Sequence, residues 1–207
     1  MSLAIPAIVA IVRFRVLEKV FYPFVFLIWI GMVNELISLL TIHFLRSTTI
    51  NNNIYSLLEA FLITWQFKRW NLFKNKDWFY YFIQIIFLIT WIGEDLIFSS
   101  IHEFNSYFNI FHGLVTVLLS INIINLLISN EQGNLIKNSI FLICIAFILY
   151  FTYTILIEIF WIYGFNESGN FQINIYFILD FINLISNLIF AVALIWMPTK
   201  QKYILRS

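Results

Sequence analysis

Long apolar stretches separated by short polar connections run along the whole chain. A helix that crosses a bilayer needs roughly 20 mostly apolar residues, and continuous runs are typical of such helices, whereas transmembrane strands alternate. The pattern therefore predicts an all-α, polytopic membrane protein with seven transmembrane helices in a single domain. The predicted spans cover residues 2–16, 20–45, 50–67, 78–101, 107–129, 139–164 and 171–197.

The composition indicates that lipid is the solvent of this chain. Hydrophobic residues make up 61% and charged residues 11%, against about 45–50% and about 25% in soluble domains. This excludes a soluble enzyme, a disordered chain, a disulfide scaffold and a nucleic-acid-binding protein. Since no connection is long enough to hold a soluble domain, we expect the chemistry within the membrane or at its edge. The single cysteine, Cys144, is expected to be a small buried hydrophobe.

Lysine and arginine are distributed unevenly between the two ends of the predicted spans. Eleven of the 12 basic residues fall on one side, and Arg46 alone falls on the other. Such an excess marks the cytoplasmic side, so we predict a cell (inner or plasma) membrane protein with its amino end outside and its carboxyl end cytoplasmic. In the first segment Arg13, Arg15 and Lys19 follow the apolar core, which is the charge order of an anchor and not of a signal peptide. This core is short, so a tilted or half-inserted helix is an alternative.

A seven-residue pattern occurs twice. Residues 53–59 read Asn-Ile-Tyr-Ser-Leu-Leu-Glu, and residues 174–180 read Asn-Ile-Tyr-Phe-Ile-Leu-Asp. Each follows a segment with an acid at a similar distance, 24 residues earlier in one case and 22 in the other. The echo suggests a 3+1+3 parallel repeat, a known plan of transporters with sites at the repeat interface. Coincidence in a chain rich in Ile, Asn and Phe is the alternative.

The predicted topology resembles that of SWEET-type sugar carriers, bacterial vitamin-precursor carriers and opsins. The resemblance is one of topology alone. The chain has no Pro-Gln motif like that of the sugar carriers, and its seventh span has no lysine of the kind that binds retinal.

Acidic side chains lie inside the predicted spans without any Lys or Arg beside them. A central acid costs roughly 2.5–3.5 kcal/mol on insertion scales, and such residues usually face a bundle interior or a watery cavity. At about 1.5 Å per residue, these acids and His112 fall between the midplane and the outer face. The six acids are Glu35, Glu59, Glu94, Asp95, Glu158 and Asp180.

Helical spacing places several of these acids on polar stripes. In the segment 171–197, polar residues recur at intervals of three or four, which puts them on one face. They are Gln172, Tyr176, Asp180, Asn183 and Asn187. Comparable stripes contain Asn52, Tyr55, Glu59 and Gln66 in one segment, and Tyr150, Thr154, Glu158 and Trp161 in another. Converging stripes predict one outward-facing acidic cavity, lined by the second, third, fourth, sixth and seventh spans.

We therefore expect a cavity for ligand or proton binding, with Glu59 and Asp180 as a central pair and Glu35 and Glu158 beside them. Its expected residues are Glu35, Glu59, Glu94, Asp95, Glu158, Asp180, His112, Tyr55, Tyr176 and Asn183. Carboxyl groups without basic partners share protons, accept hydrogen bonds or bind a cation. The first hypothesis is binding or transport of a small polar or cationic solute, with proton coupling included. The alternative for each acid is a purely structural hydrogen bond between helices.

Two further functions stay open at this point. One is a non-transporting receptor, sensor or assembly subunit, with a protein partner docked on the basic loop 68–76 or on the carboxyl-terminal tail. The other is an intramembrane hydrolase with paired carboxylates. Three histidines, of which His112 alone is embedded, are few for a zinc site, and Gly93-Glu94-Asp95 does not match the Gly-x-Gly-Asp pattern of intramembrane aspartyl proteases. We predict no catalytic residue, metal ligand or cofactor and lean against an enzyme.

Overall fold

The computed structural model describes residues 2–74, 76–98, 100–130, 135–163 and 169–198, with the backbone alone described at residues 45, 130, 169–174 and 176. Within these residues the chain is all-helical and has no strand. The helices are α1 (Ala4–Arg13), α2 (Tyr22–Leu45), α3 (Thr49–Arg69), α4 (Asp77–Ile92), α5 (Ser106–Asn130), α6 (Ser139–Ile162) and α7 (Gly169–Trp196). Short helical turns add η1 (Lys19–Phe21), a π-helical segment η2 (Gly93–Phe98) and η3 (Leu135–Lys137).

The helices lie where the apolar pattern predicts them, within a few residues at most ends. Among the described residues, five helical stretches are long and apolar enough to cross a membrane: α2 with η1, α4 with η2, α5, α6 and the greater part of α7. This architecture is that of a helical membrane protein, as predicted. The count of seven spans depends on α1 and α3, which are not among these five, and it stays a prediction.

Helix α1 is too short to cross a bilayer upright. Its ten residues extend about 15 Å, against a hydrocarbon core about 30 Å thick. It lies along the second half of α7, because Asn187 Nδ2 donates to Ser2 Oγ at 2.8 Å and the Arg13 guanidinium donates to the carbonyl oxygens of Leu194 and, at 3.3 Å, Met197. A cation at a helix carboxyl end satisfies free carbonyls and complements the helix dipole. Helix α1 therefore runs from the middle of the bundle to one end.

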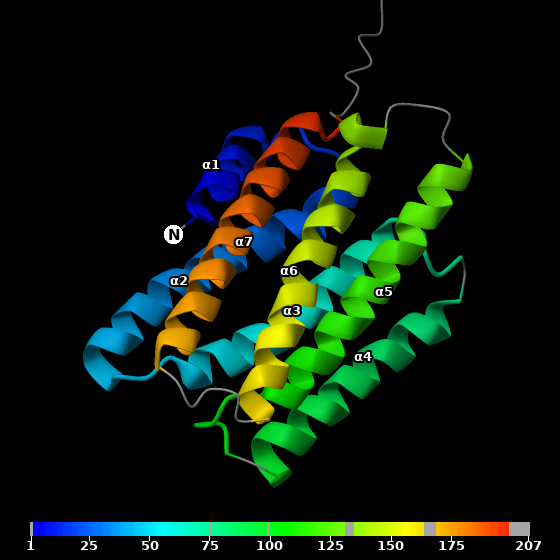
Figure 1. The fold of residues 1–207 in the computed structure, drawn as a ribbon. Coiled ribbons are helices and arrows are strands. Elements are labelled where there is room, and N and C mark those ends of the chain that lie inside the picture. Colours follow the sequence, from blue (N-terminus) through cyan, green and yellow to red (C-terminus); the bar gives the residue numbers. More distant parts are fainter. Residues whose placement is uncertain (1, 75, 99, 131–134, 164–168, 199–207) are drawn as a thin grey trace, which may run out of the picture.

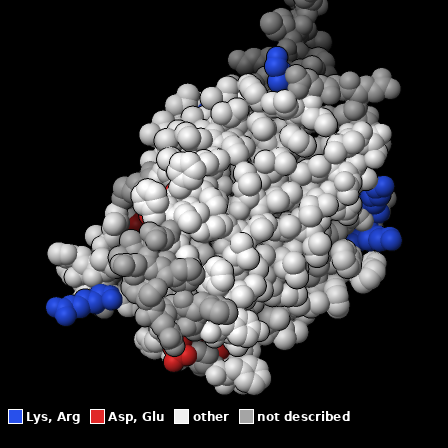
Figure 2. Space-filling view, viewed as in Figure 1, with Lys and Arg blue, Asp and Glu red and all other residues white. Residues whose placement is uncertain are grey.

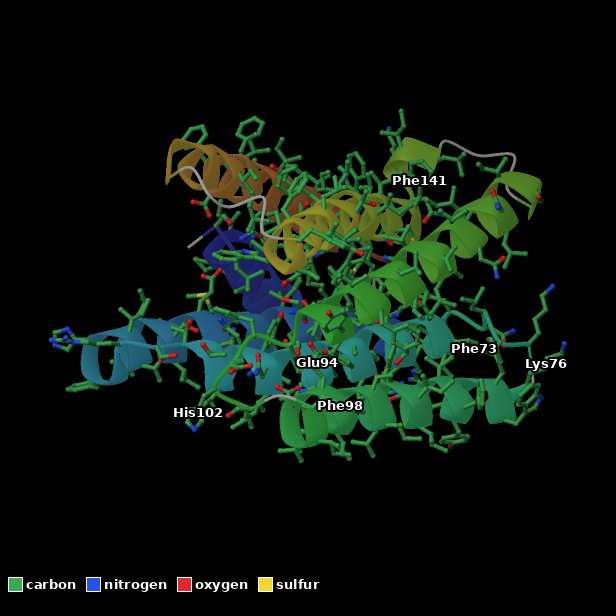
Figure 3. The ribbon with its side chains drawn as sticks, turned by 60° about the horizontal axis from the view of Figure 1, so that its bottom comes forward. Phe73, Lys76, Glu94, Phe98, His102 and Phe141 are labelled. Atoms are coloured by element: carbon green, nitrogen blue, oxygen red, sulfur yellow. The ribbon has the colours of Figure 1, made fainter. Side chains whose placement is uncertain are left out.

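The helices close into a ring. Helix α1 packs on α2 and α7, α2 on α3, α3 on α5, α5 on α6 and α6 on α7, while α4 packs on α3 and α5. Seen from below, α2, α3 and α4 form one layer and α5, α6 and α7 a second (Figures 1 and 3). Helices α2, α4 and α6 begin at the end where α3, α5 and α7 finish. We call this the basic end, because it contains Lys19, Lys68, Arg69, Lys74, Lys76 and Lys137.

Figure 3 shows Phe73 and Lys76 at the basic end and Glu94, Phe98 and His102 at the opposite end. Figure 2 shows a broad face without charge, with Lys and Arg side chains at its margins. Large apolar side chains stand fully outward, for example Val12 at 77% exposed and Phe44 at 76%. An apolar surface of this extent has no place in water and matches contact with lipid.

Gln66 ties the start of α2 to the end of α3. Its side chain is 1% exposed; its Oε1 accepts from the backbone N–H of Phe24 at 2.8 Å, and its Nε2 donates to the carbonyl oxygen of Val20 at 2.9 Å. The first N–H groups of a helix have no partner within the helix. The Gln66 side chain of α3 thus supplies a hydrogen-bond acceptor for a backbone N–H at the amino end of α2.

We expect Gln66→Met to lower the free energy of unfolding by about 2–4 kcal/mol, because it leaves a buried donor and a buried acceptor unpaired, at roughly 1–3 kcal/mol each. Chemical unfolding in detergent, followed by circular dichroism, measures the change. The control is Leu58→Met on the same helix, where the side chain is 42% exposed and the change should stay within about 0.5 kcal/mol. Equal stability of both variants would contradict the bridging role of Gln66.

Candidate functional site

A cavity of about 150 Å³ lies at mid-length of the helices, inside the ring. We call it the central cavity. It is lined by Leu3 and by residues of α2, α3, α6 and α7, and none of the described lining residues is exposed. Its polar lining residues are Asn34, Glu35, Tyr55, Glu59, Tyr150, Asn183, Ser186 and Asn187. No described lysine, arginine or histidine lines it.

Helices α2 and α3 supply the acidic wall of the central cavity. The Tyr55 hydroxyl donates to Glu59 Oε1 at 3.1 Å. From α2, Glu35 faces the same cavity, and its Oε2 is buried without a hydrogen-bond partner. Gly31 allows the two helices to approach here, since a Cβ at this position would lie 3.0 Å from the Tyr55 hydroxyl oxygen. Two carboxyl groups therefore share one small cavity without a basic partner.

Helix α7 supplies three amide and hydroxyl side chains opposite the acidic wall. Asn187 Nδ2 donates to Asn183 Oδ1 at 2.9 Å and also to Ser2. The neighbouring Ser186 is 1% exposed, and its Oγ has no hydrogen-bond partner. Buried hydroxyls are nearly always paired. An unpaired oxygen on the wall of a polar cavity is what a site for a donor-bearing ligand requires.

A second, larger cavity of about 650 Å³ opens at the end opposite the basic end. We call it the terminal cavity. Glu94, Glu103 and Glu158 line it, together with residues at the start of α5 and the end of α6. Glu158 accepts from Ser106 Oγ at 2.6 Å and from Asn109 Nδ2 at 3.0 Å. Both partners lie in the first turn of α5, so Glu158 joins α6 to α5.

Glu94 and Asp95 are adjacent in sequence but accept hydrogen bonds from two different helices. Glu94 accepts from the backbone N–H groups of Tyr107 at 2.9 Å and Phe108 at 2.5 Å, where an anion caps the positive end of α5. Asp95 is 2% exposed and accepts from Asn53 Nδ2 on α3 at 2.7 Å. Both belong to the π-helical segment η2. These two carboxylates therefore act as structural hydrogen-bond acceptors.

A cluster of amide side chains separates the two cavities. Asn34 lines the central cavity and Asn52 lines the terminal cavity. Asn34 Nδ2 donates to Asn52 Oδ1 at 3.3 Å, and Asn51 Nδ2 donates to Asn34 Oδ1 at 2.7 Å and to Ser38 Oγ at 2.9 Å. A continuous line of polar side chains thus connects the central cavity to the terminal one.

The structure divides the predicted single cavity into two. Glu35 and Glu59 line the central cavity, Glu94 and Glu158 line the terminal cavity, and Asp180 lines neither. Asp180 lies on the same stripe of α7 as Asn183, but about 4.5 Å farther along the axis, and its side chain is exposed. The expected pairing of Glu59 with Asp180 is therefore not formed, and Glu35 takes that place.

Two other predicted cavity residues are His112, which lies apart from both cavities, and Tyr176, whose side chain the structure does not describe. His112 is 2% exposed and packs against Phe87, Phe108 and Phe151, with ring centroids 4.9–5.9 Å apart. It lines neither cavity. The side chain of Tyr176 lies outside the described residues. In the described part of the chain, no group of three His, Cys, Asp or Glu side chains is placed to hold a metal ion.

The sequence interpretation missed Asn34 and Ser186. A signal for Asn34 was present: Asn34 and Ser38 are four residues apart on one face of α2, and the next helix begins with three consecutive asparagines. Two polar faces at neighbouring helix ends favour contact between them. Ser186 carried no such signal, since a serine in an apolar helix usually bonds its own backbone.

The basic loop 68–76 contributes Lys68, Arg69, Lys74 and Lys76 to the basic end. Lys68 forms an ion pair with Asp77, with Nζ and Oδ1 3.1 Å apart, and its Nζ lies 4.5 Å from the ring centre of Tyr80. Part of the charge of this loop is therefore engaged within the chain. A protein partner at this loop stays a prediction.

We expect Asp95→Ala to lower the free energy of unfolding by about 1–3 kcal/mol, because buried Asn53 and Asn105 donors lose an acceptor. The matched substitution Asp180→Ala removes an exposed carboxylate and should change stability by less than about 0.5 kcal/mol. Chemical unfolding in detergent measures both. A larger loss at Asp180 than at Asp95 would show that the structural assignment of these two acids is reversed.

Comparisons with known proteins give no family for this fold: no family model, no curated protein and no solved structure matches the chain.

Proposed function

We propose that this protein binds a small polar or cationic solute in the central cavity and carries it across the membrane, with proton coupling through the cavity acids. The observation that carries the proposal is the acidic wall. Glu35 and Glu59 line one small cavity at mid-length of the bundle, and no described basic side chain lines it with them.

A cation or a proton is the partner that this cavity lacks. An ionised carboxylate at the centre of a membrane protein is costly unless it is paired. Glu59 has one hydrogen bond, from Tyr55, and Glu35 Oε2 has none. A bound cation pairs with these oxygens, and in its absence a shared proton neutralises them. This exchange supplies the coupling between solute and proton.

The position of the cavity favours transport over simple binding. Its lining comes from α2 and α3 on one side and from α6 and α7 on the other. These are the last two helices of each half in a 3+1+3 arrangement, and transporter sites lie at the interface of such halves near the midplane. The contact of Asn34 with Asn52 lies between this site and the terminal cavity. Its opening would give the solute a polar route.

We propose the following topology for this function. Helix α3 crosses the membrane as a sixth long helix, shielded by its neighbours, and the basic end faces the cytoplasm by the positive-inside rule. The terminal cavity then opens to the outside. Helix α1 enters from the cytoplasmic end and reaches mid-depth, so that Leu3 lines the central cavity. In this proposal the first segment is the half-inserted helix that the sequence left open, so six helices cross the membrane and the amino end lies at mid-depth and not outside. The parallel repeat stays a prediction.

Neutralising the cavity acids is the direct test. A charge-assisted hydrogen bond contributes about 1.5–3 kcal/mol, so we expect Glu35→Gln and Glu59→Gln each to weaken binding of a cationic solute by about 10- to 100-fold. Purified protein in detergent is screened by thermal shift against K⁺, alkylammonium ions and small neutral polyols. The best stabiliser is then followed by uptake into proteoliposomes.

The matched control is Asp180→Asn, which neutralises an acid outside both cavities and should leave binding and uptake unchanged. The proposal fails if the double variant Glu35→Gln/Glu59→Gln takes up the solute at the wild-type rate. It also fails if no solute in the panel stabilises the wild-type protein.

A further inference from the structure

The central cavity has two walls of opposite character. One wall carries Glu35, Tyr55 and Glu59 from α2 and α3. On the other, α6 and α7 place four aromatic rings beside the polar side chains of Asn183, Ser186 and Asn187. The aromatic lining residues of the second wall are Phe147, Tyr150, Phe151 and Phe190. This combination narrows the class of solute.

The aromatic wall is continuous. The ring centroids of Phe190 and Phe147 lie 5.4 Å apart, those of Phe147 and Phe151 6.1 Å, and those of Phe151 and Tyr150 5.1 Å. Rings of this kind attract cations through the negative charge of their faces, and aromatic cages are the usual site for alkylated ammonium groups. The three Phe rings offer a hydrated ion no oxygen ligand, and Tyr150 offers one hydroxyl.

Two buried oxygen atoms in the lining of this cavity have no hydrogen-bond donor within the described residues, so a ligand can supply one. Ser186 Oγ, on a side chain 1% exposed, has no hydrogen-bond partner, and neither does Glu35 Oε2. The unpartnered hydroxyl is independent of the acidic pair, since it comes from α7 and carries no charge. A ligand that bonds to either of them needs an N–H or O–H group.

The size of the cavity limits the ligand further. A cavity of about 150 Å³ holds a molecule about the size of benzene, or roughly six non-hydrogen atoms. A bare metal cation can use the oxygens of the polar lining residues, but it has no alkyl groups to fill the aromatic side of the cavity. A neutral polyol fills the space but leaves the carboxylates without a counter-charge.

We infer that the central cavity selects a small alkylammonium ion that carries at least one N–H group. An N–H group donates to the unpartnered carboxylate oxygen of Glu35, and the alkyl groups pack on Phe147, Phe151 and Phe190. This inference rests on the proposed function and names the chemical class of its solute.

The test compares three probes of different chemistry, two of them similar in size, on the purified full chain in detergent. Trimethylammonium has a charge, alkyl groups and one N–H; tert-butanol has the alkyl groups and a hydroxyl without charge; K⁺ has charge alone. Titration calorimetry at constant ionic strength should show trimethylammonium binding at least about tenfold more tightly than either of the others, a factor that corresponds to about 1.4 kcal/mol.

Aromatic substitutions test the second wall. Phe151→Leu and Phe190→Leu should weaken trimethylammonium binding by about 3- to 30-fold, the range expected for a desolvated cation–π contact. The control is Phe87→Leu, which replaces a fully buried ring that lines neither cavity, and it should bind like the wild type. Melting temperature and size-exclusion profile establish that each variant is folded.

The outcomes separate the two proposals. If tert-butanol or K⁺ binds as tightly as trimethylammonium and binding depends on Glu35 and Glu59, the proposed function stands and the alkylammonium class is overturned. If trimethylammonium binds equally to wild type and Glu35→Gln/Glu59→Gln, both are overturned. Equal binding by wild type and the two aromatic variants overturns the role of the aromatic wall.

Discussion

The structure depends on the need to satisfy the polar side chains of α3 inside an apolar bundle. A polar group that faces hydrocarbon without a partner costs several kcal/mol, so each must find a partner on a neighbouring helix. Gln66 bonds the start of α2, Asn53 bonds Asp95 in η2, and Ser56 accepts from Asn105 before α5. Helix α3 is therefore the element around which α2, α4 and α5 are oriented.

The central cavity is one of the places in the bundle where this requirement is not fully met; Trp29 Nε1 and Thr116 Oγ1 are buried without a partner elsewhere. Glu59 is paired with Tyr55 on its own helix, while Glu35 Oε2 and Ser186 Oγ are left without partners. Elsewhere acids accept structural hydrogen bonds; Glu94, for example, caps the amino end of α5. Acids that accept hydrogen bonds from a neighbouring helix hold the helices together, and acids without such bonds stay available for a ligand. The difference between the two groups is their hydrogen-bond partners and not their depth in the membrane.

The two cavities differ in size and in how far their carboxylates are hydrogen-bonded, so the polar interior changes along the bundle axis. In the larger terminal cavity Glu94 and Glu158 accept hydrogen bonds from α5, whereas the smaller central cavity has two buried oxygens without a partner, Glu35 Oε2 and Ser186 Oγ. The asparagines of α2 and α3 lie between them and exchange hydrogen bonds with one another. Amide side chains suit this position, because they can trade one partner for another without carrying charge through the membrane.

The chain by itself determined the solvent, the helices and the polar stripes, because length, apolar content and a 3.6-residue period are local properties. It also pointed to Glu35, Tyr55, Glu59 and Asn183 as cavity residues. Acids inside apolar segments without basic neighbours, and polar residues at helical spacing, can be recognised from the sequence alone. Tertiary structure alone decided which acids share a cavity. Helical spacing gives a face but not the neighbour that covers it, so Asp180 and Asn183 look equivalent in sequence and lie in different surroundings. The π-helical turn that sends Glu94 and Asp95 to different helices, and the half-length α1 that brings Leu3 to the central cavity, likewise depend on packing between segments far apart in the chain.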